Sequence, residues 1–285
     1  MSWKNATIEV AELPTQHGLL RPWERGRAFE LEMFDPSPGV REIIQRVWIA
    51  RWDLRGRAPF YQEILPHPSI NFVVEDNSAS IWGVPTERAG RTLDGKGQAV
   101  GVKFQPGAFT AITGIEAVAI TNAAMAPLSA FPEISDPILQ SGGTDRPADS
   151  IVDAIEAVLA SYTPVDDPAL DLLADVMANM GHLSPGARVE DIARANYLSA
   201  RALQRLFRRY VGVGPKWVLK RLRIHQAVEQ LASEARPEWS ALARKLGYYD
   251  HAHFIRDFQL IVGQSPSQYA REAAKGHEGS GAMRE

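Results

Sequence analysis

The stretch LSARALQRLFRRY, residues 198–210, combines four arginines with regularly spaced apolar residues. Leu203 and Leu206 are three positions apart, so they lie on the same side of a helix. Arg201, Gln204 and Arg205 are then left on its outward side. Two uses fit this pattern, a solvated helix face and a helix that reads the bases of nucleic acid.

A second short helix is predicted just before this one. VEDIARA (189–195) is separated from it by NYLS, and Ala193 is small where two helices would have to cross closely. This is the design of a helix-turn-helix, whose second helix lies in the major groove of DNA. Tyr197 occupies the turn position that glycine usually takes. A non-glycine residue at positive φ there costs about 1 kcal/mol.

The pattern returns about 50 residues further on. In PEWSALARKLGYYDHAHFIRDFQLIVG (237–263), Ala243 is at the crossing, Gly247 is in the turn, and Phe254 and Phe258 anchor the second helix. The turn is one residue longer than in the first copy. Between the copies, GPKWVLKRLRIHQAVEQLASE (214–234) predicts a spacer helix. Two helices reading successive major grooves must lie about one turn of DNA, roughly 34 Å, apart.

Charge is unevenly distributed along the chain. Residues 182–275 contain 16 Lys and Arg against 8 Asp and Glu. The whole chain has 31 against 34, which leaves 15 against 26 for the remainder. Such asymmetry indicates one basic module suited to a polyanion and a second module that is not.

The first 130 residues predict short strands. Segments rich in Val, Ile, Phe and Trp at 45–54, 69–75, 80–84 and 99–104 are separated by Pro and Gly clusters, which favours a β-barrel or sandwich. Five of the seven tryptophans fall here, at positions 3, 23, 48, 52 and 82. Core packing is one interpretation of these aromatic residues. The other is a ligand pocket lined by Trp48, Trp52, Phe72 and Trp82.

From residue 150 onward the apolar spacing is helical. We therefore predict an α+β multidomain chain, with a small amino-terminal β-barrel and an all-helical carboxy-terminal domain that has two helix-turn-helix motifs joined by a spacer helix. The expected boundaries are 1–145 for the β-rich domain, 146–165 for a connecting helix and linker, 166–273 for the helical domain, and 274–285 for a disordered tail.

The closing segment LGYYDHAHFIRDFQLIVGQSPSQYARE, with the central RLRIHQAVEQL, resembles the AraC/XylS family of bacterial transcription regulators. The resemblance covers residues 166–273 and implies DNA binding through two recognition helices. Carried over, the base-contacting residues are Arg201, Gln204, Arg205, His251, Ala252, Ile255 and Arg256. We assign phosphate contacts to Arg208, Arg209, Lys216, Lys220 and Lys245. The amino-terminal region resembles, more weakly, a cupin-like sensor domain.

Catalytic and metal signals are weak. The chain has no cysteine, and of its seven histidines only His17 and His67 fall in the β-rich region, where neither has a second ligand at suitable spacing. We therefore expect no bound metal, no cofactor, no catalytic residue and no enzyme activity. No apolar run approaches a membrane span, and the chain is expected to be cytoplasmic.

The sequence thus predicts a sequence-specific transcription regulator that binds two adjacent major grooves of double-stranded DNA. A small-molecule effector or a partner protein acting on the amino-terminal domain would control it. RNA polymerase and a second copy of the chain, forming a homodimer, remain open as partners. Two alternatives also remain open, a cupin-like enzyme with an appended DNA-binding unit and a regulator controlled only by protein–protein contacts.

Overall fold

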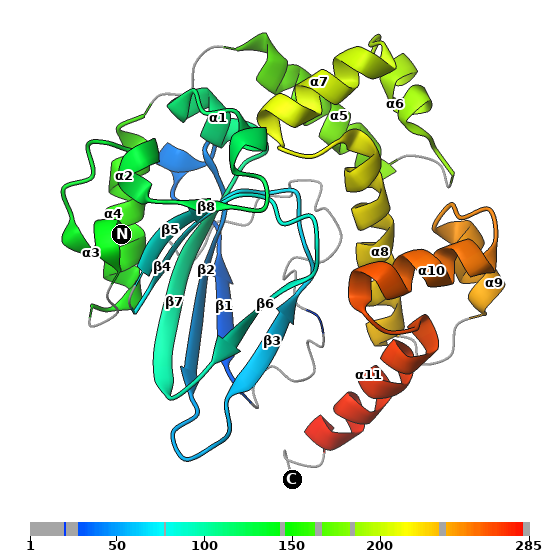
Figure 1. Cartoon of the computed structure of the whole chain (residues 1–285), viewed down its shortest axis with the longest axis horizontal. Helices are drawn as coiled ribbons and strands as arrows, with labels where there is room; N and C mark the ends of the chain where they lie inside the picture. The colour runs from blue at the N-terminus through cyan, green and yellow to red at the C-terminus, as the bar shows by residue number, and fades with distance from the viewer. Residues whose placement is uncertain are drawn as a thin grey trace.

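A computed structural model of the chain describes residues 20, 28–76, 78–142, 146–162, 167–182, 186–233 and 238–281. The predictions that involve Trp3, His17 and Trp23 lie outside these residues. The chain has a β-rich amino-terminal domain and a helical carboxy-terminal unit beside it (Figure 1). The coarse two-part architecture predicted from the sequence is confirmed.

The amino-terminal domain is built on a six-stranded antiparallel sheet with the order β1-β2-β7-β4-β5-β8. Its strands are β1 (Glu30–Phe34), β2 (Ile44–Asp53), β7 (Lys96–Phe104), β4 (Asn71–Glu75), β5 (Ser78–Trp82) and β8 (Ala124–Met125). A separate two-stranded sheet pairs β3 (Phe60–Ile64) with β6 (Ala89–Leu93).

The predicted closed barrel is wrong. Among the described residues, no ladder of hydrogen bonds joins β3 and β6 to the larger sheet. Sequence could not show this, because strands of a barrel and of an open sheet share the same alternating pattern.

One face of the large sheet is covered by helices. Val47, Ile49, Phe72 and Val100 point into a core shared with α1 (Ala108–Thr113), α2 (Pro127–Ala130), α3 (Pro137–Ser141) and α4 (Ala148–Ala160). Figure 1 shows α2, α3 and α4 together on this side. The helix predicted within 146–165 is present as α4, and its apolar stripe is buried against the sheet at Ile151, Ile155 and Leu159, so α4 packs as part of the amino-terminal domain.

The carboxy-terminal unit contains α5 (Pro168–His182), α6 (Val189–Ala195), α7 (Ala200–Tyr210), α8 (Pro215–Ser233), α9 (Trp239–Lys245), α10 (His251–Val262) and α11 (Pro266–Gly281). We call α6 with α7 the first helix pair and α9 with α10 the second helix pair. The long helix α8 runs between them (Figure 1). Val218 and Leu222 of α8 enter the core of the first pair, and Val228 and Leu231 enter the core of the second.

The last helix extends further than expected. Pro266 opens α11, and Ser265 and Gln268 bond reciprocally as its cap: the backbone N–H of Ser265 donates to the Gln268 side chain, and Gln268 N–H donates to Ser265 Oγ. The helix continues to Gly281, past the expected boundary at residue 273. Alanine and lysine at 273–275 are good helix formers, which favours this extension.

The two parts of the chain are docked together. Thr110 Oγ donates to the carbonyl of Arg209 at 3.3 Å, and Thr121 Oγ donates to that of Gly212 at 2.9 Å. Gly212 has φ +89°, and a Cβ there would lie 2.7 Å from Thr121 Oγ1, so this contact requires glycine. Leu65 of the amino-terminal domain is buried in the core of the second helix pair.

Candidate nucleic-acid interface

The start of α7 is set by its cap. Ser199 Oγ accepts a hydrogen bond from the backbone N–H of Ala202 at 3.1 Å, which satisfies one free donor of the first turn. The preceding turn has Tyr197 at φ +56°, so the strained position expected from the sequence is confirmed. Leu203 and Phe207, four and eight residues after the cap, are fully buried.

The second pair repeats this arrangement. Asp250 Oδ1 accepts from His253 N–H at 2.7 Å and caps α10, while Gly247 provides the turn at φ +75°. Phe254 and Phe258, again four and eight residues after the cap, are fully buried. Outward positions in α7 and α10 can therefore be compared by counting residues from the capping residue of each helix.

At equal distances from the cap, the two helices present different side chains. The pairs in α7 and α10 are Arg201 and Ala252, Gln204 and Ile255, Arg205 and Arg256, Arg208 and Gln259, and Arg209 and Leu260. An arginine guanidinium can pair bidentately with guanine, whereas alanine and isoleucine offer only apolar contact with a thymine methyl. Arg205 and Arg256 are the arginines that share a position in both helices.

Most of the predicted base-contacting residues are open to a partner. Arg201, Gln204, Arg205, Ala252 and Arg256 are exposed. His251 and Ile255 are only partly so. The His251 ring is stacked 6.4 Å from Trp239 and 6.5 Å from Phe254, so this side chain also packs within the second pair.

The predicted phosphate-contacting residues divide into two groups. Arg208, Arg209 and Lys216 are exposed, and so is Lys245, whose Nζ donates to Gln230 Oε1 at 3.2 Å. Lys220 differs, because its Nζ pairs with the buried carboxylate of Asp257 at 2.6 Å. Its charge therefore links α8 to α10.

Two exposed tyrosines were not singled out by the sequence as surface features. Tyr197 is 99% exposed and Tyr249 is 96% exposed, and each lies in the turn that leads into α7 or α10. Aromatic residues in both turns were visible in the sequence. Their exposure was not, because a tyrosine in such a turn can equally pack inward, as the neighbouring Tyr248 does.

The amino-terminal domain lies beside the first helix pair. A depression of about 500 Å³ is lined on one side by Gln204, Arg208 and Trp217 and on the other by Thr86, Val118 and Thr121. A predicted base-contacting residue thus shares a surface hollow with the amino-terminal domain.

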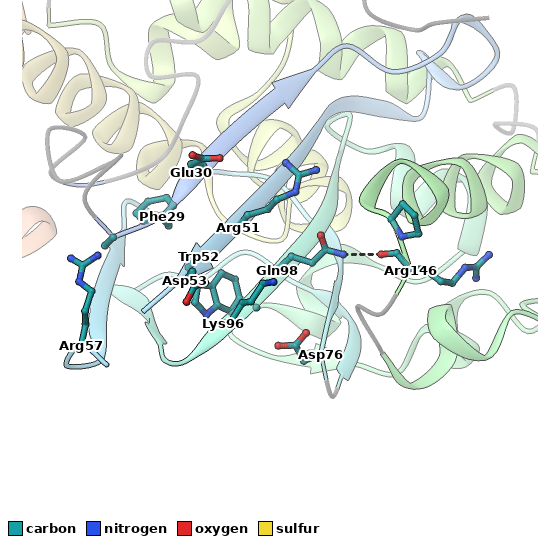
Figure 2. Close-up of a pocket in the computed structure, with 13 residues that line it drawn as sticks. Phe29, Glu30, Arg51, Trp52, Asp53, Arg57, Asp76, Lys96, Gln98 and Arg146 are labelled. Atoms are coloured by element: carbon teal, nitrogen blue, oxygen red, sulfur yellow. Dashed lines mark hydrogen bonds between the residues drawn. The ribbon is translucent and has the colours of Figure 1, made fainter. Parts of the chain in front are cut away.

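A larger depression of about 750 Å³ lies on the amino-terminal domain, between the ends of β2 and β7 and the segment before α4. Figure 2 shows Trp52, Asp76, Lys96 and Gln98 around it, with Gln98 Nε2 donating to the carbonyl of Arg146 at 3.0 Å. The Trp52 ring lies over Gly97, where a Cβ would come within 2.5 Å of it. Charged side chains of both signs thus surround a flat indole.

The structure does not bring the four predicted pocket residues together. Trp52 lines the larger depression, and Trp48, on the same sheet face, covers Gly101. Phe72 is fully buried in the core on the opposite face, stacked 6.2 Å from Phe131. Trp82, at the end of β5, is 47% exposed.

Within the described part of the chain, no three or more His, Asp or Glu side chains are grouped so that they could hold a metal ion. In the same residues, no helix combines the length and hydropathy of a membrane span.

Comparison with known proteins agrees with this geometry. Residues 192–272 match a family described as a helix-turn-helix domain (HTH_18), and residues 32–126 match a domain of unknown function (DUF6597). The regulatory protein PocR of Salmonella typhimurium is 32% identical over 93 residues, 32% of this chain and 30% of that protein. An uncharacterized HTH-type transcriptional regulator of Haemophilus influenzae is 25% identical over 150 residues, 46% of this chain and 48% of that protein. The chain matches less than half the length of either relative.

Two solved structures are also similar. A transcriptional regulator from Chromobacterium violaceum, described by its AraC-type DNA-binding domain, has 23% identity and a TM-score of 0.34, covering 38% of this chain and 96% of that one. ToxT from Vibrio cholerae has 12% identity and a TM-score of 0.37, covering 86% and 98%. From the family matches, residues 32–126 form a DUF6597 domain and residues 192–272 form a helix-turn-helix domain of the AraC type.

Proposed function

We propose that this chain is a sequence-specific DNA-binding transcription regulator whose two helix pairs occupy adjacent major grooves. The observation that carries the proposal is the repeated design of α7 and α10. Each is capped at its start, anchored by two buried residues, and exposed where base edges would lie. A single amphipathic helix would not require this repetition.

The spacer helix supports two simultaneous contacts. At 1.5 Å per residue, the 19 residues of α8 span about 28 Å. This is close to the separation of roughly 34 Å between successive major grooves on one face of DNA. Because α8 packs into the cores of both pairs, it holds them at a fixed spacing.

Sequence selectivity is proposed to rest mainly on the first helix pair. Arg201, Gln204 and Arg205 can donate or accept at base edges, whereas Ala252 and Ile255 can only contact thymine methyl groups. Arg208, Arg209, Lys216 and Lys245 are proposed to contact phosphates, which positions the protein without reading sequence. Tyr197 and Tyr249, which are exposed in the turns before α7 and α10, are proposed to add hydroxyl contacts to phosphates.

Control through the amino-terminal domain is the second part of the proposal. Its residues border Gln204 in the hollow beside α7, so a change in docking would alter access to the base-contacting surface. The depression around Trp52 is proposed to bind a small polar effector. Its charged groups would pair with the charged side chains around the depression, and a flat portion would lie against the indole. RNA polymerase and a second copy of the chain remain predicted partners.

A gel-shift experiment tests the DNA-binding proposal. Full-length protein is titrated onto the DNA upstream of its own gene, with unrelated DNA as competitor. Arg205→Ala should weaken specific binding by about 1–3 kcal/mol and relax the preference at one base pair. Lys275→Ala is the control, because it removes an exposed positive charge from α11, away from α7. Equal affinity and equal base preference in the two variants would contradict the assignment of Arg205.

A further inference from the structure

Two side chains converge on Gly97, at the start of β7. A Cβ at Gly97 would come within 2.5 Å of the Trp52 ring and within 2.7 Å of Asp76 Oδ2. Trp52 belongs to β2, while Asp76 lies in the turn between β4 and β5. The indole and the carboxylate are therefore close neighbours, and both line the larger depression of about 750 Å³ (Figure 2). We call Trp52 and Asp76 the aromatic–acid pair.

The indole ring of the pair is held in place, but no cation lies against it. Its Nε1 donates to the carbonyl of Asp94 at 3.0 Å, and the ring packs against the apolar cluster that contains Phe29. The cation–π contacts of the described residues are at the rings of Tyr210, Trp217 and Tyr248. Within this part of the chain, the Trp52 ring is therefore free to receive a cation from a ligand.

The carboxylate of the pair also lacks a cation. Asp76 is exposed and forms no ion pair with a described residue, whereas Arg91, the nearest charge that acts on it, pairs with Glu75. Loss of water raises the pKa of Asp76 above its ordinary value, and the charge of Arg91 offsets this only in part. A carboxylate that loses water without gaining a partner favours a cation beside it.

The other charges around the depression balance one another. Counted with their ion-pair partners, the charged residues of the lining are five basic (Arg51, Arg55, Arg57, Lys96 and Arg146) and five acidic (Glu30, Glu32, Asp53, Asp76 and Asp136). The lining as a whole is therefore neutral and does not repel a small cation. The side chain that meets the indole at Gly97 is acidic.

An aromatic ring beside a carboxylate is suited to bind an organic cation. The ring attracts a cation that lies within about 6 Å of its centre, and the carboxylate adds a charge-assisted contact. A metal ion does not fit, because a single carboxylate supplies too few ligands. An anion does not fit beside Gly97 either, because Asp76 would repel it.

We infer that the aromatic–acid pair binds a small organic cation, a protonated amine or a quaternary ammonium group, in the depression beside β7. Gly97 permits the site, because a side chain there would push the ring and the carboxylate apart. This site gives the chemistry of the effector, and it rests on the part of the proposed function that assigns an effector to this depression. Cation binding is measured without DNA, so its failure is distinct from a failure of DNA binding.

Thermal unfolding of the full chain provides the first test. Butylammonium chloride, choline chloride and tetramethylammonium chloride are compared with sodium chloride at equal ionic strength and neutral pH. At ten times its Kd, a bound cation should raise Tm by about 3 °C over sodium. A larger shift with butylammonium identifies an amine that donates hydrogen bonds, and a larger shift with the other two identifies a quaternary ammonium group. If none of the three raises Tm above the sodium value, the inference is overturned.

Substitutions then locate the site, with the cation that gave the largest shift as the probe in isothermal titration calorimetry. Asp76→Asn and Trp52→Leu should each weaken binding at least tenfold. Asp153→Asn and Trp82→Leu are the matched controls, because they remove an exposed carboxylate of α4 and a half-exposed ring of β5 outside the depression. Wild-type affinity in Asp76→Asn would overturn the assignment. An equal loss in Asp153→Asn would also overturn it, because a general charge effect would then explain the binding.

Two further variants keep the test decisive if Trp52→Leu does not fold. Trp52→Phe retains an aromatic ring and should retain the response to the cation. Gly97→Ala removes no functional group, but its Cβ separates the ring from the carboxylate, so the response should be lost. An unchanged response in Gly97→Ala would overturn the pairing of Trp52 with Asp76.

The stability of Asp76→Asn without an organic cation separates a ligand-binding role from a structural one. An unpaired carboxylate that has lost water does not stabilise the fold, so Tm in sodium chloride should be unchanged or higher in this variant. A structural aspartate would give the opposite sign. A lower Tm in Asp76→Asn would therefore contradict a carboxylate that is left free for a ligand.

Discussion

In the first helix pair, α7 presents four arginines and a glutamine on its outward face. In the second, α10 retains one arginine at the matching positions and replaces the others with alanine, isoleucine, glutamine and an exposed leucine. The buried positions are matched, with Leu203 and Phe207 in α7 corresponding to Phe254 and Phe258 in α10. The scaffold is therefore repeated while the outward surface is not, and under the proposed function the two pairs would have different roles on DNA.

The two pairs also differ in how they meet the amino-terminal domain. The first is held by hydrogen bonds from Thr110 and Thr121 to backbone carbonyls at and beyond the end of α7. The second is held by Leu65 packed in its core, and His225 of α8 bonds to the carbonyl of Pro66. The contact near the second pair thus includes a buried histidine.

The largest expected effect tests the repeated scaffold. Phe207→Ala and Phe258→Ala remove corresponding, fully buried rings, and each should lower the free energy of unfolding by about 3–5 kcal/mol. Urea unfolding followed by circular dichroism measures both. A loss below 1 kcal/mol in one variant and a full loss in the other would show that the two pairs are not equivalent in packing.

Acid should loosen the docking near the second pair. Burial lowers the pKa of His67 and of His225 below their usual value of 6.5, so the folded chain keeps both neutral while the unfolded chain protonates them. Stability is therefore fully present above pH 6.5 and falls as the pH decreases, by up to about 1.4 kcal/mol per unit for each histidine. The positive charge of Lys103 lowers the pKa of both histidines further, and that of Arg221 lowers the pKa of His225.

Urea unfolding at pH 7.5 and pH 5.5 measures this dependence. His225→Gln should flatten it, whereas Gln259→Ala, at an exposed position of α10 that does not titrate, should leave it unchanged. An unchanged pH dependence in His225→Gln would contradict a buried neutral histidine at this contact.

The helix caps should contribute equally in the two pairs. Ser199→Ala and Asp250→Ala each remove the acceptor of a first-turn N–H, and each should cost about 1 kcal/mol of unfolding free energy. Thermal unfolding of the two variants side by side measures the difference. A cost in one cap only would show that the start of the other helix is set by tertiary packing.

The smallest expected effect is a difference in backbone strain between the turn before α7 and the turn before α10. Tyr197 has positive φ, so Tyr197→Gly relieves strain and should change the free energy of unfolding by less than about 1 kcal/mol, in the stabilising direction. Tyr249 has no positive φ, and Tyr249→Gly should not stabilise the chain. If Tyr249→Gly alone stabilised the chain, the backbone strain would lie in the turn before α10 and not in the turn before α7.

The helical unit was largely predictable from the sequence, because its signals are local. The buried spacing of α7 and α10 and the strained Tyr197 depend on residues a few positions apart. The open sheet, the packing of α4 on it and the ion pair of Lys220 with Asp257 depend on contacts between distant residues. For the same reason the sequence did not indicate the contact between the rings of His67, in the loop before β4, and His225 of α8.

The most direct test of the different roles of the two helix pairs is selection of bound duplexes from a randomised pool. We predict two half-sites with centres about one turn of DNA apart, the half-site of the first pair being more strongly specified. Arg205→Ala should relax one position in that half-site, and Arg256→Ala should relax one in the other. Two equally specified half-sites, or a single half-site that both variants leave unchanged, would contradict the division of roles between α7 and α10.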